Sequence, residues 1–183
     1  MIDNEGYRAN VGIVIINNHQ QVLLAKRHKQ DAWQLPQGGI DEGENDVDAL
    51  FRELHEEVGL SKEHVELVAK TPKWLRYDLP EYHVRRGQKP FCRGQKQVWF
   101  LLKLTASEEH INLNQHSEIE FDDWQWVDYW HPIERVIDFK QAVYEDMLKA
   151  LAPVVFNNEH KVPKQYARPL KCCAINLGWA GII

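Results

Sequence analysis

Residues 38–60 read GGIDEGENDVDALFRELHEEVGL, and the pattern within them predicts the helix around which the domain is built. Apolar side chains recur at helical spacing over residues 46–58 and form one stripe, made of Val47, Leu50, Phe51, Leu54 and Val58. Gly59 follows directly and is a natural helix stop. We therefore expect the helix to dock by this stripe, and the residues before it, 37–45, to form a loop.

Three carboxylates lie on another face of this predicted helix. Glu53, Glu56 and Glu57 stand at i, i+3 and i+4, and at about 100° per residue they centre roughly 120° from the apolar stripe. Their mutual repulsion and their position in the last turn oppose helix stability, which suggests a compensating cation. Oxygen ligands favour Mg²⁺ or Mn²⁺ over zinc or copper. Taken alone, the same spacing is also typical of a solvated helix face.

The stretch carries more than this spacing, since nine of its positions match the specified residues of the Nudix box. These are Gly38, Glu44, Arg52, Glu53, Leu54, Glu56, Glu57, Gly59 and Leu60. The sequence thus resembles the Nudix hydrolases, which cleave a nucleoside diphosphate linked to another moiety. The resemblance implies an α/β fold, a Nudix-type α/β/α sandwich with a mixed β-sheet.

The resemblance also implies roles for individual residues. Glu53, Glu56 and Glu57 would bind divalent metal, Mg²⁺ or Mn²⁺, together with the backbone carbonyl of Gln37. Glu53 and Glu57 would be catalytic, with Glu53 helping to deprotonate the attacking water. Arg52 is expected to orient the neighbouring carboxylates.

Glu120 lies outside the box, in the run EFD. Nudix hydrolases commonly supply one further acid from a later loop, so Glu120 is expected to bind metal or to assist as a catalytic base. As a lone residue it would be read as a surface acid.

The remaining pattern predicts a single domain. Strands are expected over residues 8–17 and 21–27 as a hairpin, and over residues 65–79, 98–104 and 123–127, with a second helix over residues 136–151. We expect the Nudix hydrolase domain to span residues 6–150 and residues 151–183 to form a flexible C-terminal tail.

Runs outside the box resemble the bacterial members of the family that act on RNA. The matching runs are WQLPQGGI at 33–40, WLRYDLP at 74–80, GQKQVWFLL at 94–102, EFDDWQWVDYW at 120–130 and VIDFKQAVY at 136–144. Those enzymes convert a 5′-triphosphorylated or diphosphorylated RNA end to a monophosphate and so promote mRNA decay. By this resemblance the residues expected to contact RNA phosphates or the leading bases are Arg8, Arg27, Tyr77, Phe139 and Lys140. Phe139 is equally suited to the core.

Charge is distributed in a way that suits this substrate. Residues 70–96 hold eight Lys or Arg against two acids, whereas residues 38–66 hold ten acids against two bases. A metal site beside a basic wall fits a polyanion that enters by its phosphate end. The alternative is that Arg85, Arg86 and Lys89 merely solubilise a loop.

Two other functions are compatible with parts of the pattern. A diadenosine polyphosphate (Ap4A-type) hydrolase has the same box and much of the flanking sequence, and a non-catalytic nucleotide sensor has the same fold. Sensors usually lose box glutamates, and this chain retains them all.

Composition excludes several classes of protein. The net charge of −5 argues against coating nucleic acid by bulk attraction, and three cysteines in 183 residues do not form a disulfide framework. The sequence predicts neither a signal peptide nor the run of ~18 apolar residues that a membrane helix requires. We expect a cytoplasmic protein without membrane association, and no stable protein partner can be deduced.

Overall fold

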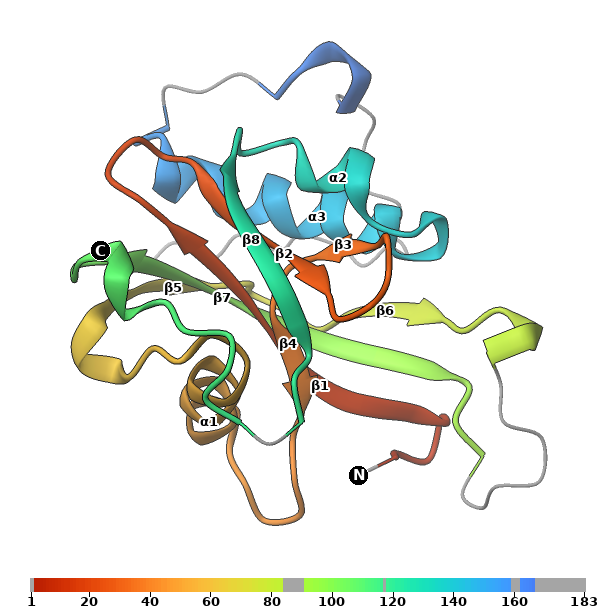
Figure 1. Ribbon diagram of the computed structural model, residues 1–183. Helices are drawn as coiled ribbons and strands as arrows, with labels where there is room; N and C mark the ends of the chain where they lie inside the picture. Colours follow the sequence, from red (N-terminus) through yellow and green to blue (C-terminus); the bar gives the residue numbers. More distant parts are fainter. Residues whose placement is uncertain (1, 84–90, 117, 159–161, 167–183) are drawn as a thin grey trace, which may run out of the picture.

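The β-sheet at the centre of the molecule is mixed and has helices on both faces (Figure 1). The computed structural model describes residues 2–83, 91–116, 118–158 and 162–166. Within these residues eight strands form one sheet in the order β3-β2-β1-β7-β5, with β4 paired to β1, β6 to β7 and β8 to β2.

The strands are β1 (Tyr7–Ile16), β2 (Val22–Arg27), β3 (Trp33–Gln34), β4 (Gln37–Gly39), β5 (Val65–Lys70), β6 (Leu75–Asp78), β7 (Gly94–Leu104) and β8 (Phe121–Val127). The α-helices are α1 (Asp46–Val58), α2 (Pro132–Arg135) and α3 (Asp138–Val155). Short 3₁₀ turns lie at Lys62–His64, Glu81–His83, Glu108–His110 and Lys164–Tyr166. Among the helices of the described part of the chain, none is long and apolar enough to cross a membrane.

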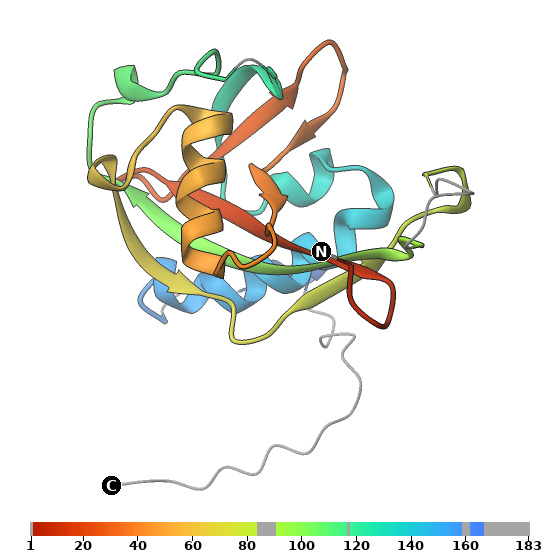
Figure 2. The same ribbon diagram turned by 90° about the horizontal axis from the view of Figure 1, so that it is seen from below.

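The parallel pair β1–β7 is the centre of the sheet, in register from Tyr7↔Gly94 to Ile16↔Lys103. Successive side chains of a strand face opposite sides, and β1 is apolar on both. Val11, Ile13 and Ile15 pack in the core under α1, whereas Val14 and Ile16 pack in the core under α3. Figure 2 shows α1 and α3 on opposite faces, which confirms the predicted α/β/α sandwich with a mixed sheet.

Helix α1 has the predicted bounds, because both of its ends are fixed locally. The Asn45 side chain accepts hydrogen bonds from the backbone N–H groups of Val47 and Asp48, which caps the first turn. Gly59 ends the helix in the left-handed conformation at φ 74°, which glycine adopts without steric cost. The predicted hairpin is also present, with β1 and β2 antiparallel.

Two predictions for the sheet were wrong. The strand expected over residues 65–79 is divided into β5 and β6, because Thr71 bonds Trp99 through both its N–H and its hydroxyl, and Pro72 follows without a backbone donor. The expected loop 37–45 begins as strand β4, whose Gly38 and Gly39 pair with Val11 and Asn10. Pairing through glycine backbone leaves no alternation of side chains that a sequence pattern could reveal.

Helix α3 differs from the expected range at its ends. It begins two residues later than predicted and continues through Pro153 to Val155, so the expected domain boundary at residue 150 lies within the helix. Tyr166 is buried and stacks on Trp130 with ring centroids 5.9 Å apart, so this part of the expected tail packs against the domain. Residues 159–161 and 167–183 lie outside the described residues.

Candidate active site

A cavity of about 540 Å³ lies where β4, the carboxylate face of α1, the polar end of the sheet and the start of α3 meet. Nine of the ten residues predicted from the sequence as site residues line it: Arg8, Arg27, Gln37, Glu53, Glu57, Tyr77, Glu120, Phe139 and Lys140. Glu56 is the exception. Further lining residues that the sequence did not suggest include Asn10, Gln34, Gln95 and Glu118.

Arg52 holds the carboxylates of the box in place. Its Nη1 donates to Glu53 Oε1 at 2.7 Å and to Glu56 Oε2 at 3.2 Å. Its Nε and Nη2 contact the two oxygens of Glu44 at 2.8 Å each, and Nη2 also donates to the Gly39 carbonyl at 2.7 Å. Hydrogen bonds from Arg52 lower the pKa of Glu44. The guanidinium is thus bound on three sides within the protein, in agreement with an orienting role.

Glu53 and Glu57 are buried acids next to each other in the cavity. Burial raises the pKa of Glu53, although Arg52 opposes this shift. Burial and the neighbouring charge of Glu53 raise the pKa of Glu57 well above its ordinary value. The Gln37 N–H donates to Glu57 Oε2 at 2.8 Å, which fixes one oxygen of this carboxylate against β4. Two adjacent buried carboxylates create a demand for positive charge.

The carboxylates that line the cavity and the Gln37 carbonyl are chemically suited to binding a hard divalent cation. Carboxylate and carbonyl oxygens are the ligands that Mg²⁺ and Mn²⁺ prefer. Within the described residues, however, no group of three or more His, Cys, Asp or Glu side chains is gathered closely enough to hold an ion. Glu56 is bonded to Arg52, and Glu120 forms an ion pair with Arg27 at 3.0 Å. Each of these two carboxylates therefore already has a cationic partner in the structure.

Aromatic and basic residues also line the cavity. The rings of Tyr77 and Phe139 lie 5.7 Å apart at 42°, and the Tyr77 hydroxyl bonds Gln95. Lys140 Nζ lies 5.7 Å from the centre of the Tyr77 ring. Phe139 packs against the core beneath α3 and also lines the cavity.

Lys140 is the most deeply buried of the three predicted RNA-binding cations that line the cavity, the others being Arg8 and Arg27. Its Nζ donates to Gln37 Oε1 at 3.3 Å and to Gln34 Oε1 at 3.4 Å. Burial, together with the nearby charge of Arg27, lowers the pKa of Lys140 to about 8. The ammonium group thus keeps its charge at neutral pH and loses it in mildly alkaline solution. Arg85, Arg86 and Lys89 of the basic stretch lie outside the described residues.

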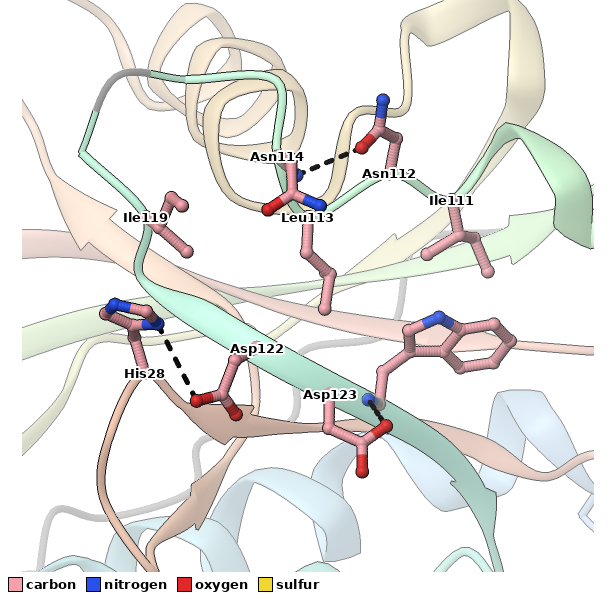
Figure 3. A pocket seen from close by; sticks show the side chains of 9 residues that line it. His28, Ile111, Asn112, Leu113, Asn114, Ile119, Asp122 and Asp123 are labelled. Carbon is pink, nitrogen blue, oxygen red and sulfur yellow. Dashed lines mark hydrogen bonds and ion pairs between the residues drawn. The ribbon is translucent and has the colours of Figure 1, made fainter.

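A second, polar cavity of about 350 Å³ lies beside β8 (Figure 3). His28, directly after β2, and Asp122 of β8 line it, with His28 Nδ1 3.6 Å from Asp122 Oδ2. His28 and Ile119 face this cavity, whereas their neighbours Arg27, Glu118 and Glu120 line the first one. None of the predicted site residues contributes to it.

The mixed sandwich and the carboxylate-bearing helix define a hydrolase of the Nudix class, and the chain belongs to the Nudix family, since the NUDIX domain model matches residues 6–151. Among named relatives, the chain is 72% identical over 177 residues to the RNA pyrophosphohydrolase of Ruthia magnifica subsp. Calyptogena magnifica, covering 97% of this chain and 99% of that protein. It is 57% identical over 152 residues to the RNA pyrophosphohydrolase of Vibrio atlanticus, covering 83% and 88%.

Solved structures agree with this fold. The Escherichia coli dihydroneopterin triphosphate pyrophosphohydrolase superposes with a TM-score of 0.60 at 21% identity, covering 78% of this chain and 97% of that one. A binary complex of the Caenorhabditis elegans Ap4A hydrolase superposes with a TM-score of 0.56 at 21% identity, covering 78% and 98%. At this identity the likeness shows a shared fold alone.

Proposed function

We propose that this protein is an RNA 5′-pyrophosphohydrolase, which converts 5′-triphosphorylated or diphosphorylated RNA ends to 5′-monophosphate ends and thereby promotes mRNA decay. The observation that carries the proposal is the composition of the cavity, where buried carboxylates lie together with cations and aromatic rings. The relatives named RNA pyrophosphohydrolase, one of them matched over nearly the whole chain, support it.

The carboxylates that line the cavity are the proposed site of hydrolysis. Glu53, Glu56, Glu57 and Glu120 and the Gln37 carbonyl would hold Mg²⁺ or Mn²⁺. When bound, such a cation neutralises the phosphate charge and lowers the pKa of water for attack at phosphorus. Glu53, with Glu57 and Glu120 beside it, accepts a proton from the attacking water. A buried carboxylate with a raised pKa is suited to that role, because it takes up a proton closer to neutral pH.

The cations and aromatic rings that line the cavity are the proposed site of RNA binding. Arg8, Arg27 and Lys140 offer positive charge to the phosphates at the 5′ end. Tyr77 and Phe139 offer ring faces on which an unpaired base can stack. Since these groups line the same cavity as Glu53, the end of an RNA can reach both sets at once. We further propose that the enzyme acts in the cytoplasm, where such transcripts occur.

The test is a competition between two substrates. A short RNA with a labelled 5′ triphosphate and diadenosine tetraphosphate are mixed at equal concentration with Mg²⁺, and both products are followed in the same tube. Preferential conversion of the RNA to a monophosphate end is expected. If the dinucleotide is consumed while the RNA stays intact, the protein is instead an Ap4A-type hydrolase. A protein that hydrolyses neither substrate contradicts both assignments.

A further inference from the structure

Gln97 is a fully buried polar residue near the start of β7, directly before the apolar run of this strand. It has 0% exposure, and the next residues on its face of the strand, Trp99 and Leu101, belong to the core under α3. Its Nε2 donates to Gln37 Oε1 at 3.2 Å, whereas its own Oε1 has no hydrogen-bond partner among the described residues. A buried acceptor without a partner costs stability. Methionine would fill a similar volume without that cost, so stability alone does not account for glutamine here.

Gln37, the partner of Gln97, is a junction between three elements. Its backbone N–H binds Glu57 of α1, and its side-chain oxygen accepts from Gln97 of β7 and from Lys140 of α3. Strand β4, to which it belongs, has only three residues and is paired with β1. Because the strand is so short, the side-chain contacts of Gln37 contribute substantially to the orientation of its backbone.

We propose that Gln97 is a positioning residue for the metal site: by binding the Gln37 side chain, it fixes the residue whose backbone N–H holds Glu57 and whose backbone carbonyl would be a metal ligand. This inference rests on the proposed function, because it takes Gln37, Glu53 and Glu57 as metal-binding residues of the cavity. Groups that orient metal ligands are commonly worth 10- to 100-fold in metal affinity or activity, so loss of this contact should be measurable.

The test compares two methionine variants on the same face of the same strand. Gln97→Met removes the donor at similar side-chain length. Leu101→Met is the matched control, because Leu101 lies four residues further along the same face of β7, is equally buried and belongs to the core under α3. Mn²⁺ binding is measured by electron paramagnetic resonance on the protein without RNA. We expect the Kd to rise five- to twentyfold in Gln97→Met and less than twofold in Leu101→Met. The Tm of metal-free Gln97→Met should equal or exceed that of the wild type.

A second variant keeps the test valid if Gln97→Met does not fold. Gln37→Met removes the acceptor but retains the backbone carbonyl, and it should weaken Mn²⁺ binding to a similar degree. The double variant should be no weaker than the weaker single variant, because both changes remove the same contact. At saturating metal, the KM of Gln97→Met for the RNA should stay within twofold of the wild type, which separates metal positioning from RNA binding.

Two failures are distinguishable. If the wild type binds Mn²⁺ and folded Gln97→Met binds it equally well, the inference is overturned while the proposed function stands. If the wild type neither binds Mn²⁺ nor hydrolyses triphosphorylated RNA, the proposed function falls and the inference with it.

Discussion

The carboxylate of Glu53 occupies the space where a side chain on Gly38 would begin: a β-carbon at position 38 would lie 1.7 Å from Cδ of Glu53. Strand β4 and helix α1 therefore touch at a point that only glycine permits. This contact explains in steric terms why the box begins with glycine fifteen residues before the glutamate it accommodates.

Replacing Gly38 should accordingly displace Glu53 without unfolding the protein. We expect Gly38→Ala to lower kcat for hydrolysis of triphosphorylated RNA at least 100-fold, because misplacement of a catalytic group by about 1 Å can have an effect of that size. Gly43→Ala is the control, since a β-carbon there meets no atom within 4 Å, and its positive φ of 79° adds only local strain. Circular dichroism would check folding, and wild-type turnover by folded Gly38→Ala would refute the steric argument.

Neutralising Glu53 tests its chemical role directly. Glu53→Gln keeps the shape and the contact with Arg52 but removes the charge, so kcat should fall by roughly 10²–10⁴. Glu63→Gln changes an exposed acid on a 3₁₀ turn and should leave turnover unchanged. Single-turnover hydrolysis of the labelled RNA measures both variants. Near wild-type turnover in a correctly folded Glu53→Gln protein would remove Glu53 from the catalytic residues.

Sequence patterns predicted the parts of this site that are local in the chain. The apolar stripe of α1, its three glutamates and the Gly59 stop all lie within thirteen residues, and the position of the stripe fixes the face on which the glutamates lie. The contact between Gln37 and Gln97 joins residues sixty positions apart. No periodicity encodes such a contact, because it depends on the pairing of β1 with both β4 and β7. Asn10 and Gln97, each a polar residue directly before an apolar run, were the available signal.

Metal binding should change the stability of the protein through Glu57. Because burial raises the pKa of this group in the folded state, the folded protein holds its proton more tightly than the unfolded chain. Stability of the metal-free protein therefore falls as pH rises from the ordinary glutamate pKa through the raised value. We expect Mn²⁺ to raise Tm by several degrees at pH 7.5, and less at pH 5.5, where protons compete for the carboxylate.

Glu57→Gln separates these two effects on stability. Glutamine still accepts a hydrogen bond from the Gln37 N–H but carries no charge, so metal-free Tm should rise above that of the wild type at pH 7.5. The increase in Tm on adding Mn²⁺ should be largely lost. Differential scanning calorimetry with and without Mn²⁺ provides both values, and an undiminished response to Mn²⁺ would show that Glu57 is not a ligand.

Lys140 should oppose stability while supporting RNA binding. Burial lowers its pKa from an ordinary 10.5 to about 8, which corresponds to a penalty of roughly 3 kcal/mol for the charged form at about 1.4 kcal/mol per pH unit. The penalty is fully present below pH 8 and fades as pH rises from 8 to 10.5, where the unfolded chain also loses the proton. Lys140→Met should therefore be more stable than the wild type at pH 7. The gain in stability should be smaller than the penalty, because the variant loses two hydrogen bonds. The difference in stability between the two proteins should shrink towards pH 10.

The same titration should appear in RNA binding. Above pH 8 the wild type loses the charge that faces the 5′ phosphates, so its KM for triphosphorylated RNA should rise several-fold between pH 7 and pH 9. In Lys140→Met the KM should be raised about tenfold at pH 7 and change little over this range. Lys149→Met, on the same helix but paired with Glu145 away from the cavity, provides the control and should follow the wild-type profile. If the KM of Lys140→Met rises with pH as steeply as that of the wild type, another group is responsible for the dependence, and Lys140 does not bind the phosphates.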